Sequence, residues 1–279
     1  MTRDANSGRR PRRRRKGDPA PTSPDVPEFG YWVRRIREAR NLSRPRAVKL
    51  LHTSESTLKA VENRGAPAQE SLVENMVTGY GLDSEQAHHT RNLAEPPIPL
   101  PSLADLRTRI DTVGRRAKLT DLDHRGIAAA YIDPLWNVVL ANEQFTELLP
   151  GLDEFDDNIA LWFFHPGLPT SPAERIVVDR AEIAAYLVSA LRGALGRYRE
   201  APHARGLVQD LRGAPEFTEP WDTTLSVAYG RRPDDPIHLR DPTTGDTYPE
   251  HVHLGDTPHC PEVRFCLCYR EYPSDPAQP

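Results

Sequence analysis

The feature that most constrains the fold is a proline run that divides the chain. Residues 95–101 read Glu-Pro-Pro-Ile-Pro-Leu-Pro, and four prolines in seven residues exclude both a helix and a central strand. Such a segment is a semi-rigid, extended linker. The 279 residues therefore split into a front part and a longer back part, and each is long enough to bury its own core.

The two parts carry opposite net charges. Residues 1–94 contain 18 Lys and Arg against 11 Asp and Glu, a net charge of +7, whereas residues 95–279 contain 18 against 29, a net charge of −11. A basic front part favours binding to a polyanion, and an acidic back part disfavours it. Random variation in surface charge is the alternative interpretation.

The composition favours a cytoplasmic protein that does not enter a membrane. No run approaches the ~20 apolar residues that cross a bilayer, and the basic N-terminus is followed by Pro and Ser instead of an apolar signal segment. Cys260, Cys266 and Cys268 are an odd number of cysteines near the C-terminus. We therefore expect no disulfide framework, as in a reducing compartment.

Residues 1–27 are predicted to form a disordered basic arm. The segment contains a run of arginines from Arg9 to Arg15, then four prolines and almost no residue that a core could bury. Such an arm can lie along phosphates or enter a minor groove, with an affinity that is sensitive to salt. A solubilising tail without specific contacts is the alternative.

Residues 28–94 show the periodicity of short helices. Apolar residues recur at intervals of three and four from Phe29 to Ala39, and shorter helices are predicted after Ser43 and Ser54. A fourth helix ends near Gly79, and a fifth covers residues 83–94. The short turn between the second and third helices predicts an all-α, five-helix domain with a helix-turn-helix.

Specific residues of this domain resemble the XRE, or lambda-repressor-like, helix-turn-helix family. Leu42-Ser43-Arg44, Ser54 to Glu62, and then Pro67 with Glu70-Ser71-Leu72 follow that family's pattern without a gap. The resemblance implies a sequence-specific transcription regulator that binds double-stranded DNA. In that family the third helix enters the major groove by its N-terminal end, while the second helix crosses the backbone.

Outward-facing polar residues of the second and third helices are the candidates for DNA contact. Serines bond bases or phosphates, Glu55 accepts from a cytosine amine, and Lys59 suits guanine or phosphate. Arg44 stands where the family usually has Gln, and His52 stands where Gly is usual, so we expect a left-handed His52. A solvated helix face is the alternative. The predicted DNA-binding residues are Arg44, Ser54, Glu55, Ser56, Thr57 and Lys59, with Arg12, Arg13, Arg14 and Arg15 of the arm.

The back part mixes helical and strand periodicities. Helices are predicted over 102–118, 142–149, 181–198, 203–212 and 215–224, and strands over 129–132, 136–140, 251–254 and 263–269. An Asp133-Pro134 turn joins the first two strands. Because the alternation is irregular, it favours an α+β domain over 102–273 rather than a doubly wound sheet. Residues 274–279 are predicted to be a disordered tail.

The back part is also similar to a known family, the MmyB-like ligand-binding domains. The resemblance lies in the segment from Ala130 to Asn142, in Asn158-Ile159 with Trp162 to Pro166, in Pro215-Glu216-Phe217 with Trp221, and in the closing strand from Cys268 to Pro273. It implies a PAS-like sheet, an apolar pocket and a small lipophilic ligand such as a fatty acid. We also expect a homodimer, the usual partner of palindromic half-sites, and a contact with RNA polymerase.

Aromatic residues supply the predicted pocket wall, although ordinary core packing is the alternative role for each of them. Arg180 stands where a Trp is common and is a candidate partner for an anionic head group. A scaffold that has lost its pocket and binds only protein is a further hypothesis. The predicted ligand-binding residues are Trp136, Phe145, Trp162, Phe163, Arg180, Tyr186 and Trp221.

A metal site is the alternative from a different class. His251 with His253, and Cys266 with Cys268, each place two metal-ligand types on one face of a strand. The spacing matches no common zinc motif, and the chain has neither a Gly-rich phosphate loop nor a Gly-x-Ser-x-Gly turn. We therefore predict no metal, no other cofactor and no enzyme, and keep a metal-dependent enzyme or metal sensor as the alternative.

Overall fold

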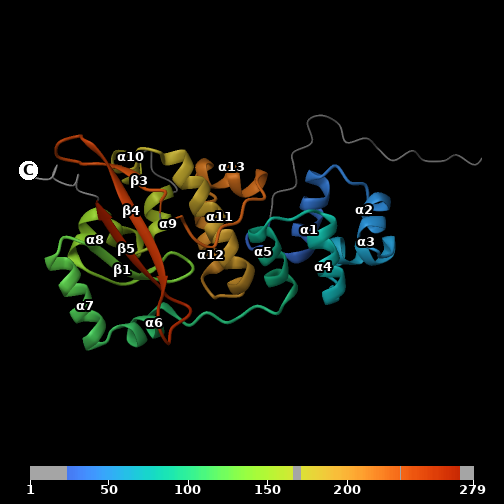
Figure 1. Ribbon diagram of the computed structural model, residues 1–279, viewed down its shortest axis with the longest axis horizontal. Coiled ribbons are helices and arrows are strands. Elements are labelled where there is room, and N and C mark those ends of the chain that lie inside the picture. Colours follow the sequence, from blue (N-terminus) through green and yellow to red (C-terminus); the bar gives the residue numbers. More distant parts are fainter. Residues whose placement is uncertain (1–23, 166–170, 233, 271–279) are drawn as a thin grey trace, which may run out of the picture.

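The fold follows the division of the chain into two parts (Figure 1). A computed structural model describes residues 24–165, 171–232 and 234–270. Five helices come first, and a five-stranded antiparallel sheet with further helices follows. The predicted fold class, an all-α helix-turn-helix domain followed by an α+β domain, is confirmed.

The first domain consists of the five predicted helices around one apolar core. They are α1 (Phe29–Ala39), α2 (Arg44–Leu50), α3 (Glu55–Arg64), α4 (Glu70–Gly79) and α5 (Ser84–Ala94). Side-chain caps start α3 and α5, where Ser54 and Asp83 accept hydrogen bonds from the N–H groups of Thr57 and Gln86. The buried core residues are Trp32, Val33, Ile36, Ala47, Leu51, Leu58, Val61, Leu72, Met76, Tyr80 and Leu93.

The end of the predicted arm packs against the second domain. Val26 is buried in the main core of that domain, and Asp25 forms an ion pair with Arg212 at 3.3 Å. The prediction of a disordered arm over 1–27 is therefore wrong for its last residues, because an apolar and an acidic side chain find partners there. Residues 1–23 lie outside the described part of the chain.

The second domain is built on a sheet with the strand order β2-β1-β5-β4-β3. Its strands are β1 (Ala128–Ile132), β2 (Val138–Ala141), β3 (Ile237–Arg240), β4 (Thr247–Asp256) and β5 (Arg264–Arg270). Its helices are α6 (Leu103–Ile110), α7 (Val113–His124), α8 (Glu143–Leu148), α9 (Ile159–Phe164), α10 (Ala173–Ile176), α11 (Arg180–Tyr198), α12 (Ala204–Leu211) and α13 (Pro215–Thr223), with a 3₁₀ turn at Leu152–Phe155. Within the described ranges, none of the helices combines the length and apolar character needed to cross a bilayer.

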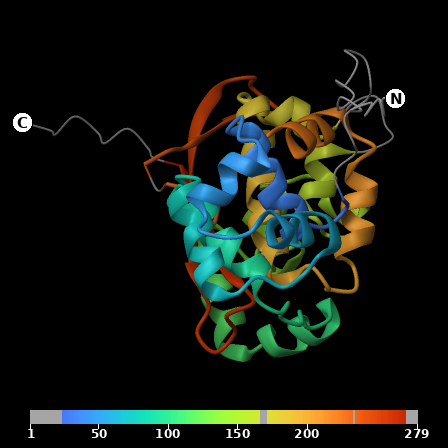
Figure 2. The same ribbon diagram turned by 90° about the vertical axis from the view of Figure 1, so that its right-hand side faces the viewer.

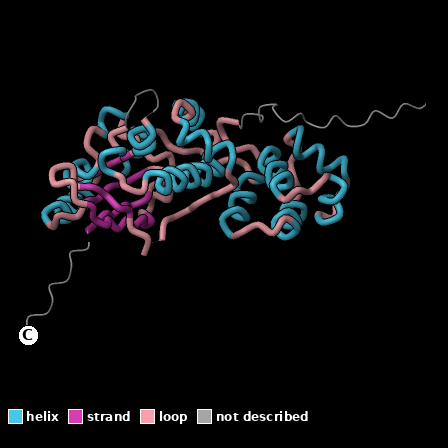
Figure 3. Tube along the Cα trace, turned by 90° about the horizontal axis from the view of Figure 1, so that it is seen from above, coloured by secondary structure: helices cyan, strands magenta, loops and turns pink. Residues whose placement is uncertain are grey.

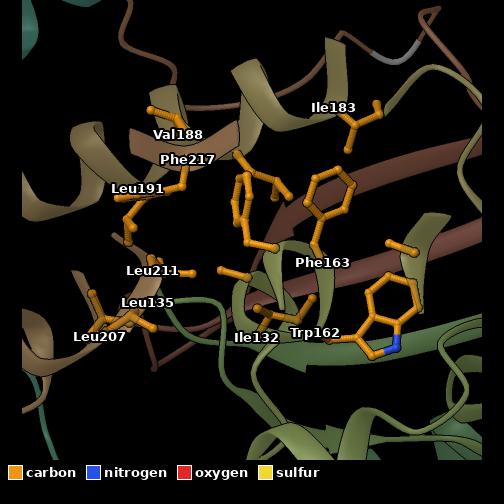
Figure 4. Packing of buried hydrophobic residues seen from close by; sticks show 14 of the residues in the cluster. Ile132, Leu135, Trp162, Phe163, Ile183, Val188, Leu191, Leu207, Leu211 and Phe217 are labelled. Atoms are coloured by element: carbon orange, nitrogen blue, oxygen red, sulfur yellow. The ribbon is translucent and has the colours of Figure 1, made fainter. Parts of the chain in front are cut away.

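Helices cover both faces of the sheet, as the central strand β1 shows. Ala129 and Tyr131 point to the face that α6 and α7 cover, whereas Ala128, Ala130 and Ile132 belong to the main core on the other face. Aromatic and branched side chains from α9, α11, α12 and α13 fill that main core (Figure 4). The labelled residues in the figure are Ile132, Leu135, Trp162, Phe163, Ile183, Val188, Leu191, Leu207, Leu211 and Phe217.

Some elements differ from the prediction because they are short or capped internally. The single helix predicted over 102–118 is two helices, since Asp111 pairs with Arg116 and the Thr112 hydroxyl caps α7 by accepting from the Arg115 N–H. The elements β3, α9 and α10 were not predicted. Each has only four to six residues, too few to show a period.

The turn between β1 and β2 delays the start of the second strand. The Asp133 carboxylate accepts hydrogen bonds from the N–H groups of Leu135 and Asn137, at 2.8 and 2.9 Å. Trp136 takes a left-handed conformation with φ of 68°. The strand predicted from Trp136 therefore starts at Val138. The Trp136 side chain does not follow the alternation of side chains along the strand.

The two domains meet where α5 packs against α11. Figure 2 looks onto the first domain, which lies in front of α11 to α13, and Figure 3 shows the strands at the opposite end of the molecule. Gly196 of α11 allows this contact, because a Cβ there would lie 2.5 Å from Nδ1 of His89. The His89 ring is fully buried and packs edge-to-face on Trp32, with 4.7 Å between ring centroids.

Residues 224–229, between α13 and β3, extend this junction. The buried Arg192 guanidinium donates to the carbonyls of Trp221 (3.0 Å) and Ser226, and so holds the segment against α11. Val227 enters the core of the first domain. The segment is therefore a piece of the second domain that completes the first.

A substitution at Gly196 tests the close helix contact. Gly196→Ala is expected to lower the free energy of unfolding by about 2 kcal/mol, because the added methyl group forces α5 and α11 apart. Urea unfolding of the full chain measures it. The matched control is Gly206→Ala in α12, where a Cβ meets nothing within 4 Å and helix propensity favours Ala. Equal stabilities of the two variants would contradict the packing argument.

The buried His89 makes stability depend on pH. Burial, aided by the charges of Arg192, His88 and Arg199, lowers the pKa of His89 from 6.5 to about 3. Between these values the unfolded chain binds a proton that the folded chain does not. Stability is therefore complete above pH 6.5 and falls with acidification, by up to about 1.4 kcal/mol per pH unit.

Urea unfolding at pH 7 and pH 5 measures this effect. His89→Leu is expected to lose about 2 kcal/mol less than the wild type over that range. Burial raises the pKa of Glu250 to about 7, which stabilises the fold on acidification, so the comparison uses the difference between the two proteins. His253→Leu, an exposed histidine, is the control. Parallel losses in all three proteins would refute the role of His89.

Candidate functional site

The turn between α2 and α3 has the geometry that the sequence predicted. His52 is left-handed, with φ of 48°, which confirms the expectation at this position. The Thr53 N–H donates to the Val48 carbonyl at 3.1 Å and closes the end of α2. Leu51 is fully buried and ties the turn to the core. The angle between α2 and α3 is thus set by packing as well as by the backbone.

A buried carboxylate joins the first three helices. Glu62 of α3 accepts two hydrogen bonds from Arg37 of α1, at 2.5 and 3.0 Å, and one from Arg44 of α2, at 2.8 Å. The Glu62 side chain is completely shielded from solvent. Burial alone would lower the pKa of Arg37, but the hydrogen bonds and charge of Glu62 outweigh it and raise that pKa.

Arg44 is therefore a positioned residue at the predicted interface. Its Nε is bound to Glu62, and one of its terminal nitrogens donates to Asn63 at 3.4 Å. The side chain is still 28% exposed. A phosphate or base that contacts Arg44 would meet a guanidinium whose orientation is already set by the protein.

The hydroxyl groups at the start of α3 bond to one another. Ser54 accepts from the Thr57 N–H at 3.0 Å, and its Oγ lies 2.8 Å from the hydroxyls of both Ser56 and Thr57. All three residues are exposed. The structure thus gives Ser54 a capping role, while the exposed hydroxyls remain able to bond a ligand because each can take part in several hydrogen bonds.

The exposed face of α2 and α3 carries more positive charge than the sequence prediction included. Glu55 and Lys59 are exposed, as predicted. Arg46, Lys49 and Arg64 are also exposed and were missed. Their helical spacing relative to the buried positions could have identified them as outward-facing cations. The predicted arm contacts Arg12, Arg13, Arg14 and Arg15 lie outside the described residues.

A cavity of about 220 Å³ lies at the junction of the two domains. His88 and Asn92 of α5 form one wall, and the face of α11 forms another. The β1–β2 turn, residues 228–229 and the adjoining ends of β4 and β5 complete it. The remaining lining residues are Ile132, Asp133, Pro134, Trp136, Tyr186, Ala190, Gly193, Ala194, Arg197, Tyr198, Ala228, Tyr229, Leu254, Pro261, Glu262 and Arg264.

Two of the predicted ligand-binding residues, Trp136 and Tyr186, line this cavity, with 6.2 Å between their ring centroids. Phe145, Trp162 and Phe163 are instead core residues, each at most 2% exposed. They were grouped with the other two because sequence shows aromatic character but not which side of a core a ring faces.

Arg180 and Trp221 also lie away from the cavity. Arg180 donates to the Glu216 carboxylate at 2.7 Å and to the Phe163 carbonyl at 2.9 Å. The partner predicted for Arg180 was the anionic head group of a ligand, but a carboxylate of the protein binds it instead. Trp221 stacks on Phe217 and lies beneath the Arg192 guanidinium. The seven predicted residues therefore do not form one site.

The register of the sheet contradicts the metal alternative. His253 pairs with Leu267, and Cys266 pairs with Leu254. Because paired residues share a face, the two histidines and the two cysteines of the predicted cluster project from opposite faces of the sheet. Cys266 and Cys268 belong to the main core, and His251 stacks on Tyr269. Residues 24–165, 171–232 and 234–270 contain no group of three or more His, Cys, Asp or Glu suited to a metal.

Two family models match the chain, in the order of its two domains. A model described as a helix-turn-helix domain matches residues 28–89. A model described as the MmyB-like transcription regulator ligand binding domain matches residues 116–278. No curated protein matches the chain.

The buried carboxylate at the centre of the helix-turn-helix can be tested by removing its charge. Glu62→Gln is expected to lower the free energy of unfolding by about 3 kcal/mol, because Arg37 stays buried without its counter-charge. Thermal and urea unfolding measure the loss. Glu74→Gln is the control, since Glu74 pairs with Arg91 at the surface, away from Arg37, and the loss of an exposed ion pair costs little. A Glu62→Gln variant as stable as the control would refute the role of this network.

Proposed function

We propose the function that follows from the family of this chain. The chain belongs to the MmyB-like transcription regulators, because the model of their ligand-binding domain matches more than half of its residues. Together with its helix-turn-helix domain, this makes the protein a DNA-binding transcriptional regulator with a C-terminal ligand-binding domain. Both matched families are regulatory rather than enzymatic. We further propose that the protein reads a specific operator, responds to a small lipophilic ligand and acts as a homodimer.

The exposed start of α3 carries the proposal of sequence-specific reading. Ser56 and Lys59 stand on a helix whose angle to α2 is held by Leu51 and Glu62. A rigidly held helix can place hydrogen-bonding groups against base edges with little loss of entropy. The exposed Arg46 of α2 is well placed to contact phosphates, as a helix that crosses the DNA backbone does.

The cavity at the junction supports the proposal of a lipophilic ligand. Aromatic and aliphatic residues make up most of its wall, with a few polar groups among them, as is usual for small-molecule sites. A fatty acid is one class of ligand with this character. Such a ligand changes DNA binding only if it binds one arrangement of the two domains better than another.

The homodimer proposal follows from the symmetry of duplex DNA. A two-fold dimer of helix-turn-helix domains reads two half-sites about 10 base pairs apart, centre to centre. Selection of bound duplexes from a random pool by the full chain is therefore expected to yield a palindrome with that spacing. Contact with RNA polymerase stays a prediction from the resemblance.

Substitution of Lys59 tests whether α3 recognises the operator. The DNA used is the duplex obtained by that selection. Lys59→Ala in the full chain is expected to weaken binding about tenfold, because one base or phosphate contact is lost. Fluorescence anisotropy at several salt concentrations measures it. A phosphate contact lowers the slope of log K against log salt by about 1 for every duplex, whereas a base contact weakens only the selected sequence.

The control removes the same charge far from α3. Arg175→Ala replaces an exposed residue of α10 in the second domain and is expected to leave DNA affinity unchanged; Figure 1 shows the position of α10. If Lys59→Ala bound the selected duplex as tightly and as selectively as Arg175→Ala, the proposal that α3 reads DNA would be abandoned.

A further inference from the structure

The cavity at the junction takes part of its wall from the DNA-binding domain. His88 and Asn92 belong to α5, and Asn92 donates to the Tyr229 hydroxyl at 3.1 Å across the junction. His88 also packs edge-to-face on Tyr229, with 4.4 Å between ring centroids. A molecule in the cavity would therefore touch both domains at once.

The size and walls of the cavity favour a compact, flat molecule. Its volume of about 220 Å³ is below the ~300–1,000 Å³ of sites for drug-sized ligands. Four aromatic side chains line it: Trp136, Tyr186, Tyr198 and Tyr229. Aromatic rings prefer edge-to-face or offset stacked partners, so these walls suit a ring better than a long, flexible chain.

The polar groups of the cavity favour an anion. Two cations line the cavity, Arg197 and Arg264, and Arg264 is paired with Asp256 at 3.4 Å. The Arg197 guanidinium has no ion-pair partner in the described part of the chain. By contrast, Glu262 already accepts from Arg109 at 3.4 Å, and the Asp133 carboxylate is occupied by its turn.

We propose that this cavity binds an aromatic carboxylate and that the DNA-binding domain forms part of the site. The ring lies between the aromatic walls, and the carboxylate accepts from the Arg197 guanidinium. His88 and Asn92 close the site from α5. This inference rests on the proposed sensing function and narrows the lipophilic ligand to a compact aryl acid.

This location couples the ligand directly to the DNA-binding domain. The helix that closes the site, α5, packs on α1 through Trp32 and on α11 through Gly196. A ligand that contacts α5 and α11 together stabilises the arrangement in which these helices touch. If that arrangement also differs in its affinity for DNA, then ligand and DNA change each other's affinity by the same factor.

The test uses 2-naphthoate as the probe and the full chain without DNA. Calorimetric titration is expected to show one site per chain, with decanoate at least about tenfold weaker. His88→Ala and Arg197→Ala are each expected to weaken 2-naphthoate binding about tenfold, equivalent to about 1.4 kcal/mol. His253→Ala and Arg175→Ala, exposed residues that do not line the cavity, are the matched controls.

His88→Ala is the decisive variant, because its residue belongs to the DNA-binding domain and is exposed enough to change without loss of the fold. Thermal unfolding of each variant checks this point, and Arg197→Ala supplies a second surface-exposed test. Absent 2-naphthoate binding, unchanged binding by His88→Ala and Arg197→Ala, or tighter binding of decanoate would each overturn the proposal. Because the Lys59 test uses DNA alone, either proposal can fail while the other holds.

Discussion

The close contact between α5 and α11 is the constraint on which the arrangement of this protein depends. At Gly196 the two helices approach so closely that the ring of His89, on α5, occupies the space that a Cβ at position 196 of α11 would need. His89 packs on Trp32, and Trp32 in turn donates to the Thr90 hydroxyl at 2.8 Å. The contact therefore runs without a gap from the second domain into the core of the first.

Two buried arginines stabilise this arrangement in different ways. Arg37 is neutralised by the Glu62 carboxylate, which fixes α1, α2 and α3 relative to one another. Arg192 instead donates to backbone carbonyls at the end of α13, where the helix dipole is negative. Burial lowers the pKa of Arg192 to about 9, so it keeps its charge at neutral pH. It thereby holds the segment that carries Val227 into the first domain.

Much of the fold was predictable because the longer elements have clear periods. The helices of the first domain, the long helix α11 and the strands β1 and β5 were predicted close to their observed bounds, whereas the strand predicted over 251–254 is the longer β4, Thr247–Asp256. The short element β3 was missed, since Ile237 to Arg240 span too few residues to distinguish a strand from a loop. Residues 24–27 were assigned to the arm because their partners, such as Arg212, are distant in sequence.

The sequence was sufficient to predict the type of each site, but not which residues form it. The polar start of α3 and the aromatic content of the second domain identified a DNA-binding element and a set of apolar residues. Which of those residues line a cavity depends on the direction of each ring. Trp136 faces the cavity because its left-handed backbone turns it out of the strand, whereas Trp162 is enclosed in the core.

The sequence by itself determined the order of the domains, the helix-turn-helix and the polar residues of α3, because these follow from local periodicity, capping and spacing. Only the tertiary structure decided that the two domains share a junction, that His88 and Asn92 face the second domain, and that the histidines of β4 and the cysteines of β5 lie on opposite faces of the sheet. The physical reason is how far apart in the sequence the interacting residues lie. Local patterns depend on residues three or four positions apart. The cavity wall depends instead on residues as distant in sequence as Asn92 and Tyr229, and the register of β4 and β5 depends on pairs such as His253 and Leu267 on different strands.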